Sequence, residues 1–224
     1  MNGLYAAVFA LDSHRLRQEV AANNLANLET PGFKRGVVGQ WGFEGVLGLV
    51  EARGGLDLSQ GDLVPTGGVL DVALEGPGFL CVEAAGGECY VRGGWLGCSS
   101  DGQLVTADGA PVLGDGGPIQ LGAGASIMVG EDGRVAVDGA EVGRLRLVEL
   151  DAASIEAEGG GRYRGASPSP AAATRVRAGH LERGNASSIE ELVGLITIQR
   201  SFEATSRAID TTLKTIERAT ADLR

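Results

Sequence analysis

A line of large apolar residues near the C-terminus constrains the fold of this chain more than any other feature of its sequence. From Leu195 to Leu223 such residues recur at intervals of seven, and others widen the line, so that all fall on one face of an α-helix. The stripe consists of Leu192, Leu195, Ile198, Phe202, Ile209, Leu213, Ile216 and Leu223. Ser187 and Ser188 each precede a glutamate by three residues, the capping-box spacing that opens a helix. We therefore expect a long helix over residues 188–223 whose apolar face lies against a partner.

Residues 3–28 predict a second helix, whose apolar side chains fall on two sides rather than one. One side carries Leu4, Val8, Leu11, Ala22 and Leu25, and the other carries Tyr5, Phe9, Leu16 and Val20. A helix with two apolar sides can contact two neighbours at once. Because the sequence has no other strong helical pattern, we expect the two terminal helices to pair in opposite directions and to leave their second apolar faces for other molecules.

Between the two predicted helices lies an acidic, glycine-rich stretch. The chain of 224 residues has 37 glycines, and all but Gly3, Gly32 and Gly194 lie within residues 36–188. Asp-Gly pairs begin at positions 101, 108, 115, 132 and 138, and glycine accepts the positive φ that tight hairpins require. From Leu70 onward, short alternating or apolar runs separate the turns, which is typical of β-strands.

The predicted fold class is therefore α+β, with long N- and C-terminal helices that form an antiparallel helical or coiled-coil region and with a central antiparallel β domain. We expect four segments along the chain. They are an N-terminal helical segment over residues 1–33, an extended connector over 34–69, a β-rich outer domain over 70–183 and a C-terminal helical segment over 184–224.

Charge and hydrophobicity exclude several classes of function. A net charge of −10 disfavours binding to nucleic acid or to an anionic membrane surface, since both need clustered lysine and arginine. The sequence has no run of 18 apolar residues, so no membrane span is expected. Residues 3–11 are apolar but lack the basic start and the small-residue cleavage site of a secretory leader, so we expect no cleaved signal peptide.

No arrangement of residues in the sequence predicts catalysis, a bound cofactor or a bound metal. The two histidines, His14 and His180, lie in a predicted helix and a predicted strand, and no motif couples either of them to a nucleophile. Cys81, Cys89 and Cys98 match no metal-ligand spacing. We therefore expect neither an enzyme nor a metalloprotein.

The cysteines also give a prediction about strand register. If Gly86 and Gly87 form a two-residue hairpin turn, Cys89 lies opposite Ala84, and Cys81 points to the other face of its strand. No disulfide is then expected between the two thiols.

The end of the first predicted helix carries the longest motif in the sequence. Residues 23–34 read Asn-Asn-Leu-Ala-Asn-Leu-Glu-Thr-Pro-Gly-Phe-Lys, and Pro31 should end the helix near Leu28. This segment resembles the signature of the flagellar axial proteins, the rod and hook family, in which Asn-Asn-Leu-Ala-Asn is followed by threonine and then by Gly-Phe and a basic residue. The match falls on Asn23–Asn27, Thr30 and Gly32–Lys34.

The resemblance covers the chain from end to end and is weakest in the connector. The further matching segments are Leu70–Gly76, Gly78–Phe79, Tyr90–Gly109, Gly179–Asn185, Glu191–Val193 and Gln199–Glu203. In Gly179–Asn185, which is similar to the family's Gly-x-Leu-Glu-x-Ser-Asn, Gly184 stands where serine is usual.

The resemblance implies a structural subunit of the bacterial flagellar basal-body rod, located in the basal body. Many copies would assemble through their terminal helices into a tubular axial structure. The implied partners are copies of the chain, other rod and hook subunits, and the flagellar type III export apparatus. Neither nucleic acid nor a small-molecule substrate is implied.

More than one kind of protein remains compatible with the sequence. Within the family, Pro111–Gly114 and Pro118–Ile119 resemble a proximal-rod subunit, whereas Glu190–Val193 and Gln199–Arg200 resemble the distal-rod type. A hook-type subunit of the same family, a coiled-coil adaptor that does not polymerise, and a secreted enzyme on a β scaffold also stay open. The adaptor would form a small, defined oligomer, and the enzyme would need a cluster of histidines or carboxylates.

The expected subunit interface combines the apolar faces of both helices with residues of the motif. Asn23, Asn24 and Asn27 suit hydrogen bonds across a packed interface better than a role in ending the helix alone. The predicted interface residues are Leu4, Val8, Leu11, Asn23, Asn24, Leu25, Asn27, Phe33, Leu192, Leu195, Phe202, Ile209, Leu213 and Ile216.

Overall fold

The computed structural model describes residues 2–42, 50–122 and 126–221. Contacts between residues divide the chain into two compact units. The helical unit contains the described residues of Met1–Ala26, Gly36–Gly55 and Ala186–Arg224, and the β unit contains those of Asn27–Arg35 and Leu56–Asn185. The chain therefore passes from one unit to the other four times.

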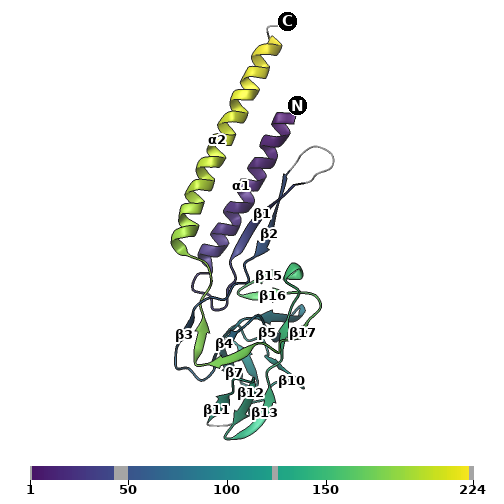
Figure 1. Cartoon of the computed structure of the whole chain (residues 1–224), viewed down its shortest axis with the longest axis vertical. Coiled ribbons are helices and arrows are strands. Elements are labelled where there is room, and N and C mark those ends of the chain that lie inside the picture. The colour runs from purple at the N-terminus through teal and green to yellow at the C-terminus, as the bar shows by residue number, and fades with distance from the viewer. Residues whose placement is uncertain (1, 43–49, 123–125, 222–224) are drawn as a thin grey trace. The chain divides into compact units, whose positions relative to one another are not determined.

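The helical unit consists of two helices and a two-stranded sheet. α1 spans Asn2–Ala26 and α2 spans Ser188–Ala221, and the two lie side by side and run in opposite directions (Figure 1). β1 (Gly36–Gly42) pairs with β2 (Val50–Leu56), and β1 contacts α1. α2 carries two glutamates in its first turn and Arg218 in its last, which are the charges that a helix dipole favours at these ends.

α1 ends within two residues of the predicted position, and a turn follows it in the β unit. The Thr30 N–H donates to the Asn27 carbonyl at 3.0 Å, and the Phe33 N–H donates to the Thr30 carbonyl at 3.2 Å. Gly32 adopts a φ of +68°, and a Cβ atom at this position would lie 2.7 Å from Cβ of Arg92. Glycine alone fits this turn, because any larger residue would meet both the strained φ and the collision.

The strand pairs of the β unit are antiparallel, and its two larger sheets contain ten strands. The four-stranded sheet has the order β18 (Arg175–Ala178), β4 (Asp71–Glu75), β7 (Gly93–Cys98) and β8 (Leu104–Thr106). The six-stranded sheet has the order β15 (Glu156–Gly159), β16 (Arg162–Arg164), β6 (Gly87–Val91), β5 (Phe79–Ala84), β14 (Leu147–Glu149) and β17 (Ser169–Pro170).

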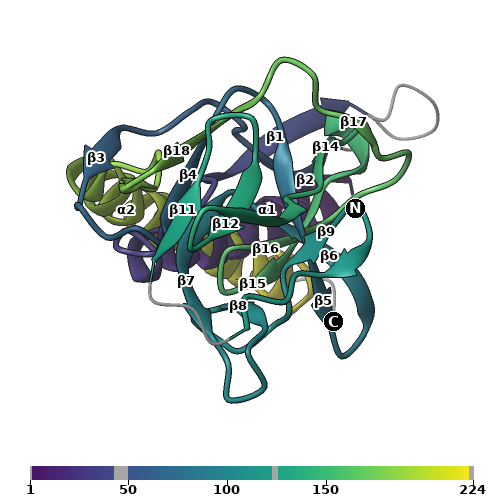
Figure 2. The same ribbon diagram turned by 90° about the horizontal axis from the view of Figure 1, so that it is seen from below.

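Three smaller sheets and a short 3₁₀-helix complete the described part of the β unit. β11 (Ile127–Val129), β12 (Arg134–Val137) and β13 (Ala140–Arg144) form one sheet, and β11 and β12 can be seen side by side in Figure 2. β9 (Leu113–Gly114) pairs with β10 (Gly117–Pro118), and β3 (Leu63–Pro65) pairs with β19 (His180–Glu182). The 3₁₀-helix η1 spans Ala152–Ser154.

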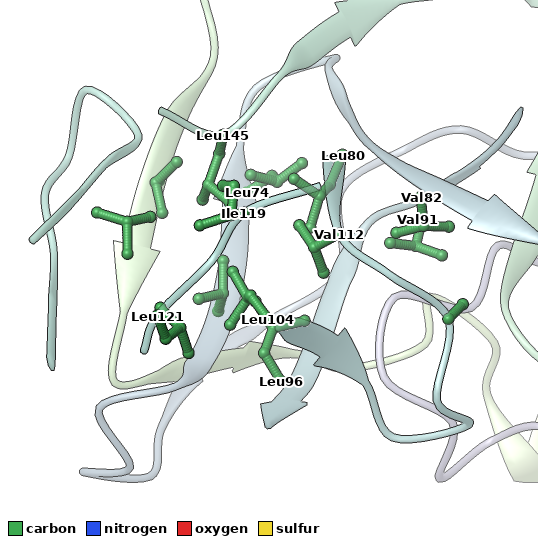
Figure 3. Packing of buried hydrophobic residues seen from close by; sticks show 14 of the residues in the cluster. Leu74, Leu80, Val82, Val91, Leu96, Leu104, Val112, Ile119, Leu121 and Leu145 are labelled. Carbon is green, nitrogen blue, oxygen red and sulfur yellow. The ribbon is translucent and has the colours of Figure 1, made fainter. Parts of the chain in front are cut away.

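Two clusters of buried apolar side chains lie on the two faces of β5. Leu80 and Val82 point into the larger cluster, and Phe79 and Cys81 point into the smaller one, because successive side chains of a strand face opposite ways. Figure 3 shows the larger cluster, whose labelled members include Leu74, Leu96, Leu104, Val112, Ile119 and Leu145. Full burial of one such side chain contributes about 1.5 to 3 kcal/mol, so this cluster is the main source of stability of the β unit.

The predicted fold class is wrong in its helical part. The sequence predicted an antiparallel helical or coiled-coil region, whereas the described residues contain one α-helix near each end and a much larger region of mostly antiparallel strands. In the described part of the chain, the two helices do not bury the predicted stripe as a coiled coil would. Leu192, Phe202 and Leu213 of that stripe are exposed. Leu223, the last residue of that stripe, lies outside the described residues. A regular apolar spacing shows that a helix is amphipathic, but it does not show that a second helix covers it along its length.

The register of β5 and β6 also differs from the prediction. The turn is formed by Ala85 and Gly86, one residue earlier than expected, so Cys89 pairs with Val82 rather than with Ala84. Cys89 nevertheless belongs to the larger buried cluster and Cys81 to the smaller one, on opposite faces of the sheet. All three cysteines are free thiols.

Candidate functional site

α2 presents large apolar side chains to solvent on a side that the sequence analysis did not single out. Ile189, Val193 and Ile196 are 74%, 58% and 54% exposed, and Leu192 beside them is also exposed. At 3.6 residues per turn, the first three lie within about 60° of one another around the helix. We call Ile189, Leu192, Val193 and Ile196 the α2 apolar patch. Ile189, Val193 and Ile196 have the i, i+4, i+7 spacing of one helical face. This second face was not distinguished from the longer line of residues at intervals of seven.

Most of the predicted stripe lies on the other side of α2. The half-buried residues on this side are Gly194, Leu195, Ile198, Ser201, Thr205, Ser206 and Ile209. Because α1 and α2 pack against each other, we assign this side of α2 to the contact with α1. Phe202 and Leu213 belong to the same side of α2 but remain exposed. Ile216 belongs to α2, but its side chain is not among those that the structure describes.

α1 also carries exposed apolar residues. Val8 and Phe9 are exposed, whereas Leu11 and Leu25 are half-buried. The predicted faces placed Val8 and Phe9 on different sides of the helix, and both sides therefore reach solvent. Leu4 lies in α1, but its side chain is outside the described set.

Asn24 joins three elements of the helical unit. Its side-chain oxygen accepts a hydrogen bond from the Gly36 N–H at 2.8 Å, and its amide donates to the Gly36 carbonyl at 2.9 Å and to Oε1 of Glu191 at 3.2 Å. A Cβ atom at Gly36 would lie 2.9 Å from Cγ1 of Val20, so the backbone approaches α1 closely at this point. Asn24 is 1% exposed. It thus ties the end of α1 to the start of β1 and to the first turn of α2.

The other predicted motif residues have different surroundings. Asn23 is exposed, and Asn27 is half-buried and accepts a hydrogen bond from the Thr30 hydroxyl at 3.2 Å. Phe33 is buried in the β unit. The structure therefore places Asn24 and Phe33 inside their own units rather than at the surface.

Three motif segments of the β unit meet in a buried polar cluster. Nζ of Lys34 donates to Oε1 of Glu182 at 2.8 Å and to the Ser59 carbonyl at 2.7 Å. Nε of Arg92 donates to Oε2 of Glu182 at 3.0 Å. The Tyr163 hydroxyl accepts from the Lys34 backbone N–H at 2.7 Å and donates to the Gly32 carbonyl at 3.1 Å. We call Lys34, Arg92, Tyr163 and Glu182 the Glu182 cluster.

The surroundings of this cluster change its proton affinities. Burial lowers the pKa of Lys34, and the nearby carboxylate of Glu182 opposes this change. Burial also raises the pKa of Tyr163 far above its usual value, so its hydroxyl stays neutral and keeps its role as a hydrogen-bond donor.

The motifs that contain Lys34, Arg92 and Glu182 can be recognised in the sequence, but the contact between these three residues cannot. Each motif contains more than one charged residue, so the sequence did not single out Lys34, Arg92 or Glu182 as the buried one. Tyr163 belongs to none of the motifs. Lys34 and Glu182 are 148 positions apart, and no local pattern reports a contact over that separation.

The described residues offer little to hold a metal or to span a membrane. Over residues 2–42, 50–122 and 126–221, histidine, cysteine, aspartate and glutamate form no group of three or more that could hold a metal ion. The described helices include none that is long and apolar enough to cross a membrane. Nδ1 of His180 lies 3.1 Å from the Ala178 carbonyl, two residues away in the chain.

Comparison with protein families finds three matches along the chain. A family described as flagella basal body rod protein matches residues 4–34. The D1 domain of the flagellar hook proteins FlgE, FlgF and FlgG matches residues 73–137, and the C-terminal region of the flagellar basal body rod proteins FlgE, FlgF and FlgG matches residues 177–221.

Individual proteins match over nearly the whole chain. The flagellar basal-body rod protein FlgF of Caulobacter vibrioides is 34% identical, over 94% of this chain and 93% of its own length. The FlgF protein of Salmonella typhimurium is 33% identical, over 93% of this chain and 92% of its own length. The flagellar basal-body rod protein FlgG of Bacillus subtilis is 26% identical, over 94% and 95% respectively.

Proposed function

Because this chain belongs to the flagellar basal-body rod proteins, we propose that it assembles with copies of itself through the apolar side chains that α1 and α2 leave exposed. The chain is a structural subunit of the bacterial flagellar basal-body rod. Its partners in the basal body are other rod or hook subunits. The motif resemblance further supports export by the flagellar type III apparatus.

The α2 apolar patch is the observation that carries this proposal. Its four large side chains lie together at the start of α2, and none of them is covered by the described part of the chain. Burial of one such side chain in a partner contributes about 1.5 to 3 kcal/mol. Neighbouring exposed apolar side chains on a protein surface mark a site of protein contact. The patch is therefore the first surface that we expect a neighbouring subunit to cover.

The charges that follow the patch suit contact between identical chains. Arg200, Glu203, Arg207, Asp210 and Lys214 continue along the same side of α2 with alternating sign. Arg207 donates to Glu203 at 3.2 Å on the exposed surface. Alternating charges let two copies of one helix face each other without a net repulsion. This pattern supports a contact that begins at the patch and continues along α2.

The test is Ile196→Asp, which places a carboxylate at the centre of the patch. We expect the variant to lose self-association in sedimentation at increasing protein concentration and to fail to restore motility to cells that lack the native chain. The matched control is Thr197→Asp, which adds the same charge at the next position, about 100° around the helix. Normal assembly and motility of Ile196→Asp would contradict the proposal. Equal losses in both variants would show that added charge, and not the patch, is responsible.

A further inference from the structure

Glu182 lies between two buried cations of the β unit. Its Oε1 is 2.8 Å from Nζ of Lys34, and its Oε2 is 3.0 Å from Nε of Arg92. The three side chains are only 1% to 3% exposed. The Gly61 N–H also donates to Oε1, at 3.0 Å. Each carboxylate oxygen therefore faces one cation, and solvent does not reach the group.

The cluster holds two positive charges and one negative charge. Backbone carbonyls stabilise the excess positive charge: Lys34 donates to Ser59, while Arg92 donates to Gly76 at 2.7 Å, to Leu74 at 3.1 Å and also to Gly78. A buried ion pair adds little stability over apolar residues of the same volume, but loss of one partner leaves an unpaired buried charge at a high cost. Such a cluster discriminates strongly between chain arrangements that keep all its partners and arrangements that lose one.

We propose that Glu182 is a positioning residue that makes the docking of two chain segments depend on each other. The first segment is residues 27–35, which carries Lys34, and the second is β19, which carries Glu182 itself. Without β19, Lys34 and Arg92 would face each other in a buried site with no carboxylate between them. Residues 27–35 therefore dock stably only when β19 is in place.

Both segments lie at points where the chain leaves the β unit for the helical unit. Arg35 directly precedes the helical unit, and Asn185 directly precedes the return of the chain to it. Oδ1 of Asn185 accepts from the Arg35 N–H at 2.7 Å, which adds a second tie between the same two segments. The Glu182 cluster thus fixes the exit of the chain from the β unit at both points. This holds whether or not the subunit assembles through α2.

Hydrogen exchange of the full-length chain, followed by mass spectrometry, tests the proposal. Glu182→Gln keeps the shape of the side chain and one acceptor oxygen but removes the carboxylate that lies between the two buried cations. We expect amide protection in residues 27–35 and 179–185 to fall by about 100-fold or more. The amides of β4 and β5 in the core should keep their protection.

A second variant tests the charge balance of the cluster. Its expected result would not be explained by a purely structural role of Glu182. Lys34→Met alone keeps the Arg92–Glu182 pair and should cost little protection. Lys34→Met combined with Glu182→Gln returns the site to one positive charge, the same net charge as in the native cluster. We therefore expect the double variant to recover most of the protection that Glu182→Gln loses. If Glu182 acted only by packing or hydrogen bonding, the double variant would lose at least as much protection as Glu182→Gln alone.

Glu75→Gln is the matched control. Glu75 pairs with Arg177 at 2.7 Å, but these side chains are 47% and 36% exposed to solvent, so this change should leave both segments protected. If Glu182→Gln fails to fold, amide protection is measured in the double variant, which is expected to fold. Unchanged protection of residues 27–35 in Glu182→Gln, or a double variant that is worse than either single one, would overturn the proposal.

Discussion

The two units of this chain differ in where they keep their apolar side chains. Among the buried apolar residues that the structure describes, Ala21 is the single one in the helical unit, and all the others lie in the β unit. Conversely, the helices expose Val8, Phe9, Ile196 and Phe202, among others. The β unit is complete as one folded body, whereas the helical unit leaves its apolar surface open. A subunit built in this way can keep its shape in one part and bind neighbours with the other.

The largest difference between the two units should appear in their resistance to protease. In the isolated monomer, we expect trypsin to cleave within residues 1–30 and 190–224 roughly tenfold or more faster than within 70–180, because a unit without a buried core opens at a small cost in free energy. Mass spectrometry of the fragments over time would measure this. Uniform resistance of the whole chain would show that the helices are held as firmly as the β unit.

The core of the β unit should be far more sensitive to truncation than the helix pair. Leu104 is fully buried in the larger cluster, so Leu104→Ala should lower the free energy of unfolding by about 2 to 5 kcal/mol. Leu195 is half-buried, and Leu195→Ala should cost about 1 kcal/mol. Urea denaturation followed by circular dichroism would compare the two variants. Equal costs would mean that the helix pair has a core of its own.

Phe202→Asp separates assembly from folding. The side chain is exposed in α2, so we expect the β unit of this variant to melt like the native one while self-association and motility are lost. Thr197→Asp, which adds the same charge about 140° around the helix, is the control and should assemble nearly normally. Motile cells that contain Phe202→Asp at the native protein level would argue against a contact at this side of α2. A loss of β-unit stability would instead link α2 to the core.

The buried thiol of Cys81 should have a smaller effect, which is a dependence of stability on pH. Burial raises the pKa of Cys81 to about 11, from an ordinary value of 9.0. The thiol therefore ionises at a lower pH in the unfolded chain than in the folded chain. The contribution of the neutral, buried thiol to stability is complete below pH 9.0 and is lost as the pH rises towards 11. We expect stability to fall over this range, and to fall less in Cys81→Ala. Denaturation at several pH values would measure the difference, and identical profiles would contradict it.

The same cysteines should differ in their reaction with a thiol reagent. Cys98 is exposed, whereas Cys81 and Cys89 are buried. In the native protein at about pH 8 we expect one thiol to react quickly and the other two to react only after unfolding. Peptide mapping after labelling would identify the site. Rapid labelling of Cys81 would show that the smaller cluster opens to solvent.

The sequence predicted local features better than it predicted contacts. The apolar spacing located both helices, and the motif located the end of α1, because these signals lie within a few residues of one another. It did not predict that Ile189, Val193 and Ile196 would be the exposed side of α2. The spacing of apolar residues shows which side chains share a face, but only the packed structure shows which face its partner covers.

Contacts over long separations account for what the sequence did not predict. The expected place of Asn24 in a subunit interface stays a prediction, but its hydrogen bond to Glu191, 167 positions away in the same chain, was not foreseen. The approach of Arg92 to Glu182 spans 90 positions. A one-residue change in the turn before Gly87 was enough to move Cys89 opposite a different partner. Each of these depends on tertiary packing, which a single sequence pattern does not contain.

Because the chain passes four times between its units, some elements are synthesised long before the elements that they pack against. α1 is made first during synthesis, but α2 and Glu191, against which it packs, come last. Closure of so long a loop becomes possible only when nearly the whole chain exists. The β unit likewise waits for β19 to supply Glu182. α1 is therefore made long before the helix that it pairs with, and a growing chain carries the apolar faces of α1 without that partner until α2 has been made.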